Sequence, residues 1–248
     1  MMPDPGKKPQ ATPKPAHYAN GMLALWQIRL EGDWSRHETY RILNIFQRLS
    51  EQSGGKSILE IFNGQSTTLH RSGRPGRVGR TRGQEIFLDE DWTDWTFAHE
   101  LGHRWNNAWD RQPEKRLQRM VGAGRNEWLR KVTRRLIIST EKALNRLGIT
   151  ARLDWRALWY HPGEAPPPCG VDRNFNASED LAESFAAMIL QEDAQKRARR
   201  AVERMGEDGK RWDWPSQFQN YPATPRGQSV ALLLKNLPAA KENLRQTN

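Results

Sequence analysis

His99 and His103 are the residues whose types and spacing point most directly to chemistry. They lie four positions apart, so on a helix both imidazoles project from one face and can reach the same metal ion. Glu100 follows the first histidine directly, where its carboxylate can contact a water on that metal without being a ligand itself. The segment therefore predicts a metal-activated water with Glu100 as its general base.

The residues around this pair predict a strand, a short turn and then the helix that carries both histidines. The run 85–89 is apolar at its centre and bounded by polar residues, as expected of a short strand. A helix over 92–108 would follow it, with Asp91 or Thr93 as the N-cap. Three of its apolar residues fall on one stripe that we expect to face the core: Phe97, Leu101 and Trp105.

A catalytic zinc takes three protein ligands and keeps a fourth position for water, so one further ligand is needed. The segment 176–190 supplies candidates, because Asn176 or Ser178 can cap a helix there whose apolar residues share one face. Glu179 and Glu183 lie four positions apart on this predicted helix. One of them can bind the metal while the other accepts the N–H of a metal-bound histidine.

The two segments together resemble the gluzincin zinc metallopeptidases, most closely the anthrax-lethal-factor-like group. In that group the first motif reads H-E-x-G-H, as it does here from His99 to His103. The second motif of the group reads Asn-x-x-Glu-x-x-Ala-Glu-x-Phe. It is matched by Asn176, Glu179, Ala182, Glu183 and Phe185.

The resemblance implies a zincin-like α+β fold and hydrolysis of peptide bonds by a zinc-activated water. It assigns one Zn²⁺ per chain to His99, His103 and Glu179, with Glu100 as the general base. Glu183 would orient His99 without binding the metal. The substrate would be a peptide or a protein.

One position departs from the pattern of that family. A tyrosine seven residues before the ligand glutamate stabilises the oxyanion there, whereas Asp172 occupies this position here. Three other side chains in the chain could donate the missing hydrogen bond: Tyr160, His161 and Tyr221.

Patterning along the chain predicts an α+β arrangement in two lobes. A helix over 39–49 and strands over 57–62 and 85–89 would build a small sheet with a backing helix. The predicted divisions are a Pro/Lys-rich disordered tail over 1–17, an N-terminal lobe with the active-site helix over 18–109, a basic helical insertion over 110–170, and a mostly helical C-terminal lobe carrying the third ligand over 171–248.

Arginines and glycines alternate through residues 70–83, which predicts a flexible cationic loop just before the 85–89 strand. Its arginines are Arg71, Arg74, Arg77, Arg80 and Arg82. In zincins the strand before the active-site helix often lines the cleft by extended pairing, so this loop could favour acidic substrates. A site for phosphate backbones and a simple solvated turn are the alternatives.

The net charge of +10 favours anionic partners. The rival interpretation is therefore a basic nucleic-acid-associated protein with a structural or vestigial metal site. An intact Glu100 argues against it, because a purely structural metal needs no carboxylate at that position.

The remaining composition bears on the compartment. A single cysteine excludes an internal disulfide, and no apolar run reaches the roughly 20 residues of a membrane helix. The N-terminal residues lack the apolar stretch of a signal peptide. We therefore expect a cytoplasmic location, with export by a signal-independent machine as the alternative.

Overall fold

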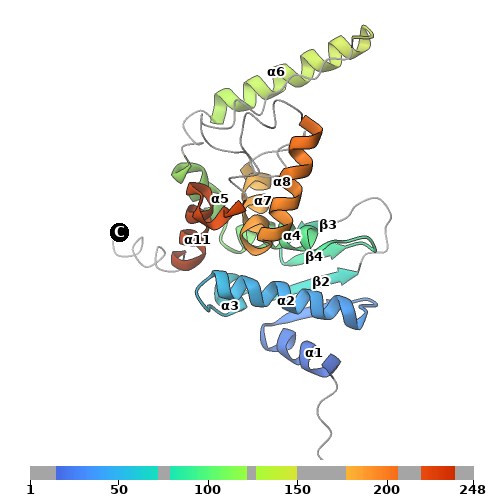
Figure 1. The fold of residues 1–248 in the computed structure, drawn as a ribbon, viewed down its shortest axis with the longest axis vertical. Helices are drawn as coiled ribbons and strands as arrows, with labels where there is room; N and C mark the ends of the chain where they lie inside the picture. Colours follow the sequence, from blue (N-terminus) through green and yellow to red (C-terminus); the bar gives the residue numbers. More distant parts are fainter. Residues whose placement is uncertain (1–14, 72–78, 122–126, 150–176, 206–218, 238–248) are drawn as a thin grey trace, which may run out of the picture.

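The structure, a computed structural model, describes residues 15–71, 79–121, 127–149, 177–205 and 219–237. Within these ranges the fold mixes α and β elements, with one small sheet set among helices that contain most of the described residues (Figure 1). None of these helices is both long and apolar enough to cross a lipid bilayer. The predicted tail over 1–17 lies outside the described ranges as far as residue 14. Its last residues belong to helix α1 (Pro15–Leu25), so disorder was the wrong prediction for them.

The sheet has four strands in the order β1-β2-β4-β3. The first three in this order run parallel: β1 (Ile28–Glu31), β2 (Thr67–Arg71) and β4 (Glu85–Leu88). Strand β3 (Gly79–Arg82) pairs antiparallel with β4 and forms one edge. The strand predicted over 85–89 is confirmed as β4, but it lies inside the sheet and has no free edge.

Part of the segment that we predicted to be a flexible loop is this edge strand. Residues 70 and 71 end β2, and Gly79–Arg82 forms β3, so the loop prediction is wrong at both ends of the segment 70–83. Arg82 pairs with Glu85 across a two-residue turn in which Gly83 has a φ of 60°. A positive φ at this position suits a tight hairpin. Pairing with β4 then gives Gly79–Arg82 an extended backbone, although its arginines and glycine do not favour a strand.

The helix predicted over 39–49 is present and longer, as α2 (Arg36–Gln52). The strand predicted over 57–62 is wrong, because this segment forms the short helix α3 (Ile58–Ile61). The Ser57 hydroxyl accepts from the Glu60 backbone N–H, and the Glu60 carboxylate accepts from the Ser57 backbone N–H. This reciprocal capping box closes a helical turn at the point where the apolar run alone suggested a strand.

Helix α4 (Asp94–Ala108) carries the histidine pair and begins after Thr93, whose hydroxyl accepts from the Thr96 backbone N–H. The predicted core stripe is confirmed, since Phe97 and Leu101 are fully buried and Trp105 is 1% exposed. The start of the helix is held by Arg41, whose Nε donates to Asp94 at 2.7 Å and whose guanidinium lies 4.0 Å from the Trp92 ring centroid.

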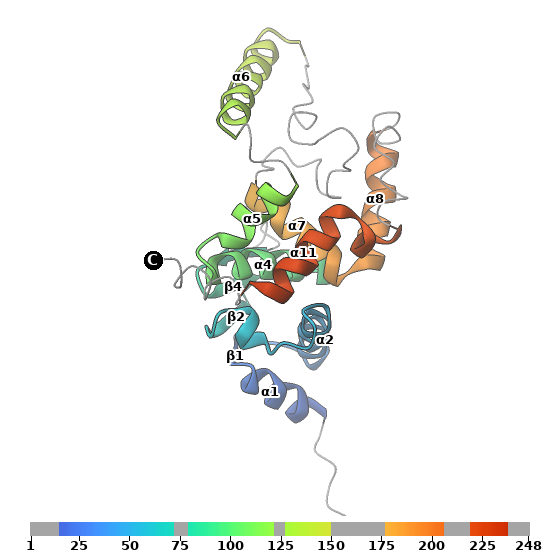
Figure 2. The ribbon, with the colours of Figure 1, turned by 90° about the vertical axis from the view of Figure 1, so that its left-hand side faces the viewer.

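Two helices follow α4 in the described residues: α5 (Gln112–Met120) and α6 (Glu127–Arg146). In both ribbon views α6 extends away from the remaining elements (Figures 1 and 2). Of the insertion predicted over 110–170, the structure describes residues 110–121 and 127–149. Residues 122–126 and 150–176 lie outside the described ranges.

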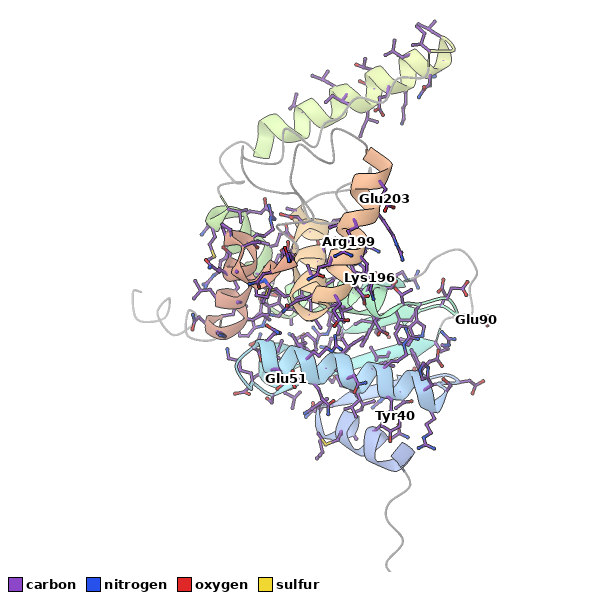
Figure 3. The ribbon with its side chains drawn as sticks, in the orientation of Figure 1. Tyr40, Glu51, Glu90, Lys196, Arg199 and Glu203 are labelled. Atoms are coloured by element: carbon purple, nitrogen blue, oxygen red, sulfur yellow. The ribbon has the colours of Figure 1, made fainter. Side chains whose placement is uncertain are left out.

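The described residues of the C-terminal part are helical. Its elements are α7 (Ala177–Ile189), α8 (Gln191–Met205), the 3₁₀ turn η3 (Tyr221–Ala223) and α11 (Pro225–Asn236). Helix α8 carries exposed charged residues along its length, including Lys196, Arg199 and Glu203 (Figure 3). We did not predict α11, although Thr224 followed by proline is a recognisable helix start.

A buried ion pair joins α7 to α11. Arg226 Nη1 lies 2.5 Å and 2.6 Å from the two carboxylate oxygens of Asp180, and the two side chains are 5% and 4% exposed. Gln118 of α5 also donates to Asp180, at 2.9 Å. Removing one partner of such a pair typically costs about 3–5 kcal/mol, because the other charge is left buried without compensation. The pair therefore fixes the first turn of α7, which includes Glu179.

Candidate metal centre

Side chains from α4 and α7 converge on one point. The Nε2 atoms of His99 and His103 lie 3.1 Å apart. The Glu179 carboxylate lies 3.1 Å from Nε2 of His99 and 3.5 Å from Nε2 of His103. Ligand atoms around a tetrahedral metal bound at 2.0–2.1 Å are separated by about 3.3 Å. These three residues could hold one metal ion, and in the described part of the chain they form the only group of this kind.

Both imidazoles are held from their outer nitrogens. Nδ1 of His99 lies 2.8 Å from Oε1 of Glu183, which also accepts from the Trp95 indole at 3.3 Å. Nδ1 of His103 lies 3.2 Å from the Ser178 hydroxyl. Fixing Nδ1 in this way turns each Nε2 toward the shared point, as in proteins whose histidines bind metals. The sequence predicted Ser178 as a possible helix cap and gave no sign that it contacts His103.

The charges around this point favour a bound cation. Burial lowers the pKa of His99, but its hydrogen bonds to Glu179 and Glu183 outweigh burial and raise that pKa to about 10. Burial opposes ionisation of Glu179, yet the hydrogen bonds from His103 and His99 hold its pKa far below the usual range. Glu179 therefore stays ionised at neutral pH and stabilises positive charge between the two helices.

A glycine allows α4 and α7 to approach closely enough for these contacts. A Cβ atom added at Gly102 would lie 2.7 Å from Cα of Ala182 and 3.2 Å from the carbonyl oxygen of Ala182. Real Cβ atoms essentially never lie 2.7 Å from backbone, so a larger residue would push the two helices apart. The glycine inside the histidine motif is thus required by helix packing.

The side chain of Glu100 lies against the edge strand β3. It is 6% exposed, and its Oε2 accepts from the Thr81 hydroxyl at 2.6 Å. A Cβ added at Gly79 would lie 3.0 Å from Cγ of Glu100, so the strand backbone lies directly against this side chain. The sequence patterns did not identify Thr81 or Gly79 as neighbours of Glu100, because no strand was predicted over 79–82.

Of the three predicted oxyanion donors, Tyr221 alone falls within the described residues. Tyr160 and His161 lie outside them, as does Asp172. Tyr221 is 2% exposed and lies close to Ser184, and burial raises the pKa of its hydroxyl. In this structure protein atoms enclose that hydroxyl, so it is not offered to a substrate beside the histidines.

The described arginines of the 70–83 segment have different surroundings. Nη2 of Arg71 lies 3.0 Å from Oε1 of Glu38, and its Nη1 donates to the Asp89 carbonyl, which are structural contacts. Arg80 and Arg82 are exposed and alternate with the half-buried Gly79 and Thr81 along β3. The Arg80 guanidinium lies 4.6 Å from the centroid of the Phe87 ring. Arg74 and Arg77 lie outside the described residues.

Replacing Gly102 by alanine should lower the free energy of unfolding by about 1–3 kcal/mol, the usual cost of overpacking a core. The matched control is Gly21→Ala in helix α1, where an added Cβ would meet no atom within 4 Å. That substitution should leave stability unchanged or raise it by up to about 1 kcal/mol through helix propensity. Urea denaturation measures both, and equal stabilities of the two variants would show that α4 and α7 do not pack as described.

The chain matches no model of a known protein family, and no curated protein and no solved structure matches it. Evidence about its function therefore comes from the side chains themselves. The relevant features are the converging group of His99, His103 and Glu179 and the buried Glu100 beside it.

Proposed function

We propose that this protein is a zinc-dependent metallopeptidase of the gluzincin type with a zincin-like fold. The observation that carries the proposal is the convergence of two Nε2 atoms and one carboxylate from α4 and α7, with both Nδ1 atoms held from outside. Two histidines and one glutamate are a donor set of catalytic zinc in peptidases. His99, His103 and Glu179 would hold one Zn²⁺ per chain.

Zinc bound here would lower the pKa of a water ligand and polarise the scissile carbonyl. Glu100 accepts a proton from the attacking water and returns it to the leaving amine. Glu183 and Ser178 keep the two imidazoles in orientation, and Thr81 and Gly79 enclose the Glu100 side chain. The donor that stabilises the oxyanion is not among these residues.

The number of ligands favours a catalytic over a structural metal. Structural zinc sites are usually closed by four protein ligands, whereas the described residues supply three. Glu100 directly follows the ligand His99 and is 6% exposed, and a structural metal site would not need a carboxylate at this position. Both features support a peptidase over the alternative of a basic nucleic-acid-associated protein with a vestigial metal site.

β3 is an edge strand of the sheet among the described residues, and an extended peptide could add a strand there beside Glu100. Side chains of such a peptide would alternate between the side of α4 and the opposite sheet face. On that face the exposed Arg82 pairs in register with Glu85, which in turn pairs with Thr68. We therefore propose a preference for peptides with acidic residues at alternate positions.

Replacing Glu100 by glutamine should abolish hydrolysis while leaving the metal in place. Gln keeps the shape and the contact with Thr81 but cannot accept the proton, and a positioned base contributes about 10²–10⁴-fold. The measurements are kcat on a peptide library and zinc per chain. The control is Glu85→Gln on the exposed sheet face. A Glu100→Gln variant as active as the wild type would exclude Glu100 as the base.

Glu179→Ala and Glu183→Ala should differ in zinc retention after dialysis against a mild chelator. Loss of the ligand Glu179 should remove essentially all zinc, whereas loss of an outer partner costs about 10–100-fold in affinity and leaves a substantial fraction. Glu192→Ala, an exposed glutamate of α8, should retain all of it. The reverse ranking of the first two variants would make Glu183 the ligand.

The preference for acidic peptides can be tested at β3. Arg82→Gln should raise KM for peptides with alternating acidic residues severalfold at low salt and have little effect at high salt, where screening is strong. Arg29→Gln is the matched control, because Arg29 lies in the same cross-strand row at the opposite sheet edge. An equal effect of both variants, or an effect that ignores ionic strength, would refute edge-strand docking as the source of the preference.

A further inference from the structure

Thr81 is the residue of the edge strand that reaches across to Glu100. Its Oγ1 lies 2.6 Å from Oε2 of Glu100 and 3.0 Å from the backbone carbonyl oxygen of the same residue. Thr81 pairs with Ile86 of the neighbouring strand β4, and the Ile86 side chain is fully buried. The pairing of β3 with β4 therefore helps to position the hydroxyl beside Glu100.

The backbone of β3 restricts Glu100 from a second direction. A Cβ at Gly79 would lie 3.0 Å from Cγ and 3.2 Å from Oε1 of Glu100, so a side chain at position 79 would displace the Glu100 side chain. The Thr81 hydroxyl contacts the other carboxylate oxygen. The backbone at Gly79 and the hydroxyl of Thr81 therefore both lie against the Glu100 side chain.

The two acceptors near the Thr81 hydroxyl suit a general base in both of its states. A hydroxyl has one proton to donate and two lone pairs to accept. It can donate to Oε2 while Glu100 is a carboxylate. When Glu100 carries the proton of the attacking water on Oε2, the hydroxyl can accept from Oε2–H and donate to the Glu100 carbonyl instead. No further proton is gained or lost in this exchange.

We propose that Thr81 is a positioning residue that holds the Glu100 carboxylate for proton transfer. The inference rests on the proposed function, because it assigns a partner to the base of that reaction. In this role the Thr81 side chain acts on Glu100 and not on the metal ligands. Its effect should appear in the chemical step and not in substrate binding.

The experiment compares Thr81→Val with Thr81→Ser. Valine has nearly the shape of threonine but lacks the hydroxyl, and a displacement of about 1 Å at a reacting group can cost about 10²-fold in rate. Thr81→Val should lower kcat by about 10–100-fold. KM should stay within about twofold of the wild type and zinc per chain should not change, because only a group that acts in the transition state is displaced.

Thr81→Ser should keep kcat within about threefold, since serine retains the donor. Thr68→Val is the matched control and should leave kcat unchanged, because Thr68 lies in β2, which β4 separates from β3.

The outcomes separate this inference from the proposed function. If the wild type hydrolyses peptides and Thr81→Val has the same kcat, the role of Thr81 is wrong and the peptidase assignment stands. If the zinc-loaded wild type hydrolyses no peptide, both are wrong. Thr81→Ala serves as a second variant without a hydroxyl. Loss of zinc or of folding in both variants would show a structural role and overturn the proposal.

Discussion

The close approach of α4 and α7 is the constraint on which the candidate site depends. Gly102 lies against the backbone of Ala182, and at this distance Glu179 and Glu183 reach the two histidines. Any side chain at position 102 would separate the helices and with them the ligand atoms. The glycine of the histidine motif and the alanine of the second motif are therefore two halves of one contact.

Each helix is also fixed on the side away from this contact. The first turn of α7 is held by the buried pair of Asp180 and Arg226. Helix α4 is held to the sheet by Arg104, which is fully buried and donates to Thr67 and to the Ser66 carbonyl. Burial lowers the pKa of Arg104 to about 10, because desolvation disfavours the charged guanidinium. Such buried polar contacts fix orientation more than they add stability.

Helical periodicity was sufficient to predict the histidine pair, the core stripe of α4 and the faces of α7. These elements are long, and their apolar residues repeat clearly. The elements that failed are short. In α3 a capping box overrode an apolar run that suggested a strand, and in β3 pairing with β4 made a strand of Gly79–Arg82, where arginine and glycine gave no strand signal. Intrinsic preference is weak over four residues, so tertiary contacts decide.

For the candidate site, too, only relations within one helix could be predicted from the sequence. Spacing along a helix gave the pairs His99/His103 and Glu179/Glu183. Contacts between different elements could not be predicted, because no local pattern relates Thr81 to Glu100 or Ser178 to His103. Ser178 was visible only as a possible helix cap. The choice of Glu179 over Glu183 came from a resemblance, and the geometry now gives it a reason, since Glu179 faces both Nε2 atoms and Glu183 faces one Nδ1.

Zinc K-edge X-ray absorption of the purified full-length protein tests the metal centre most directly. The account predicts about one zinc per chain with only nitrogen and oxygen neighbours at about 2.0–2.2 Å, including an imidazole signature from two histidines. A sulfur neighbour at about 2.3 Å would indicate a cysteine-bound structural site. That result, or the absence of stoichiometric zinc, would contradict the account.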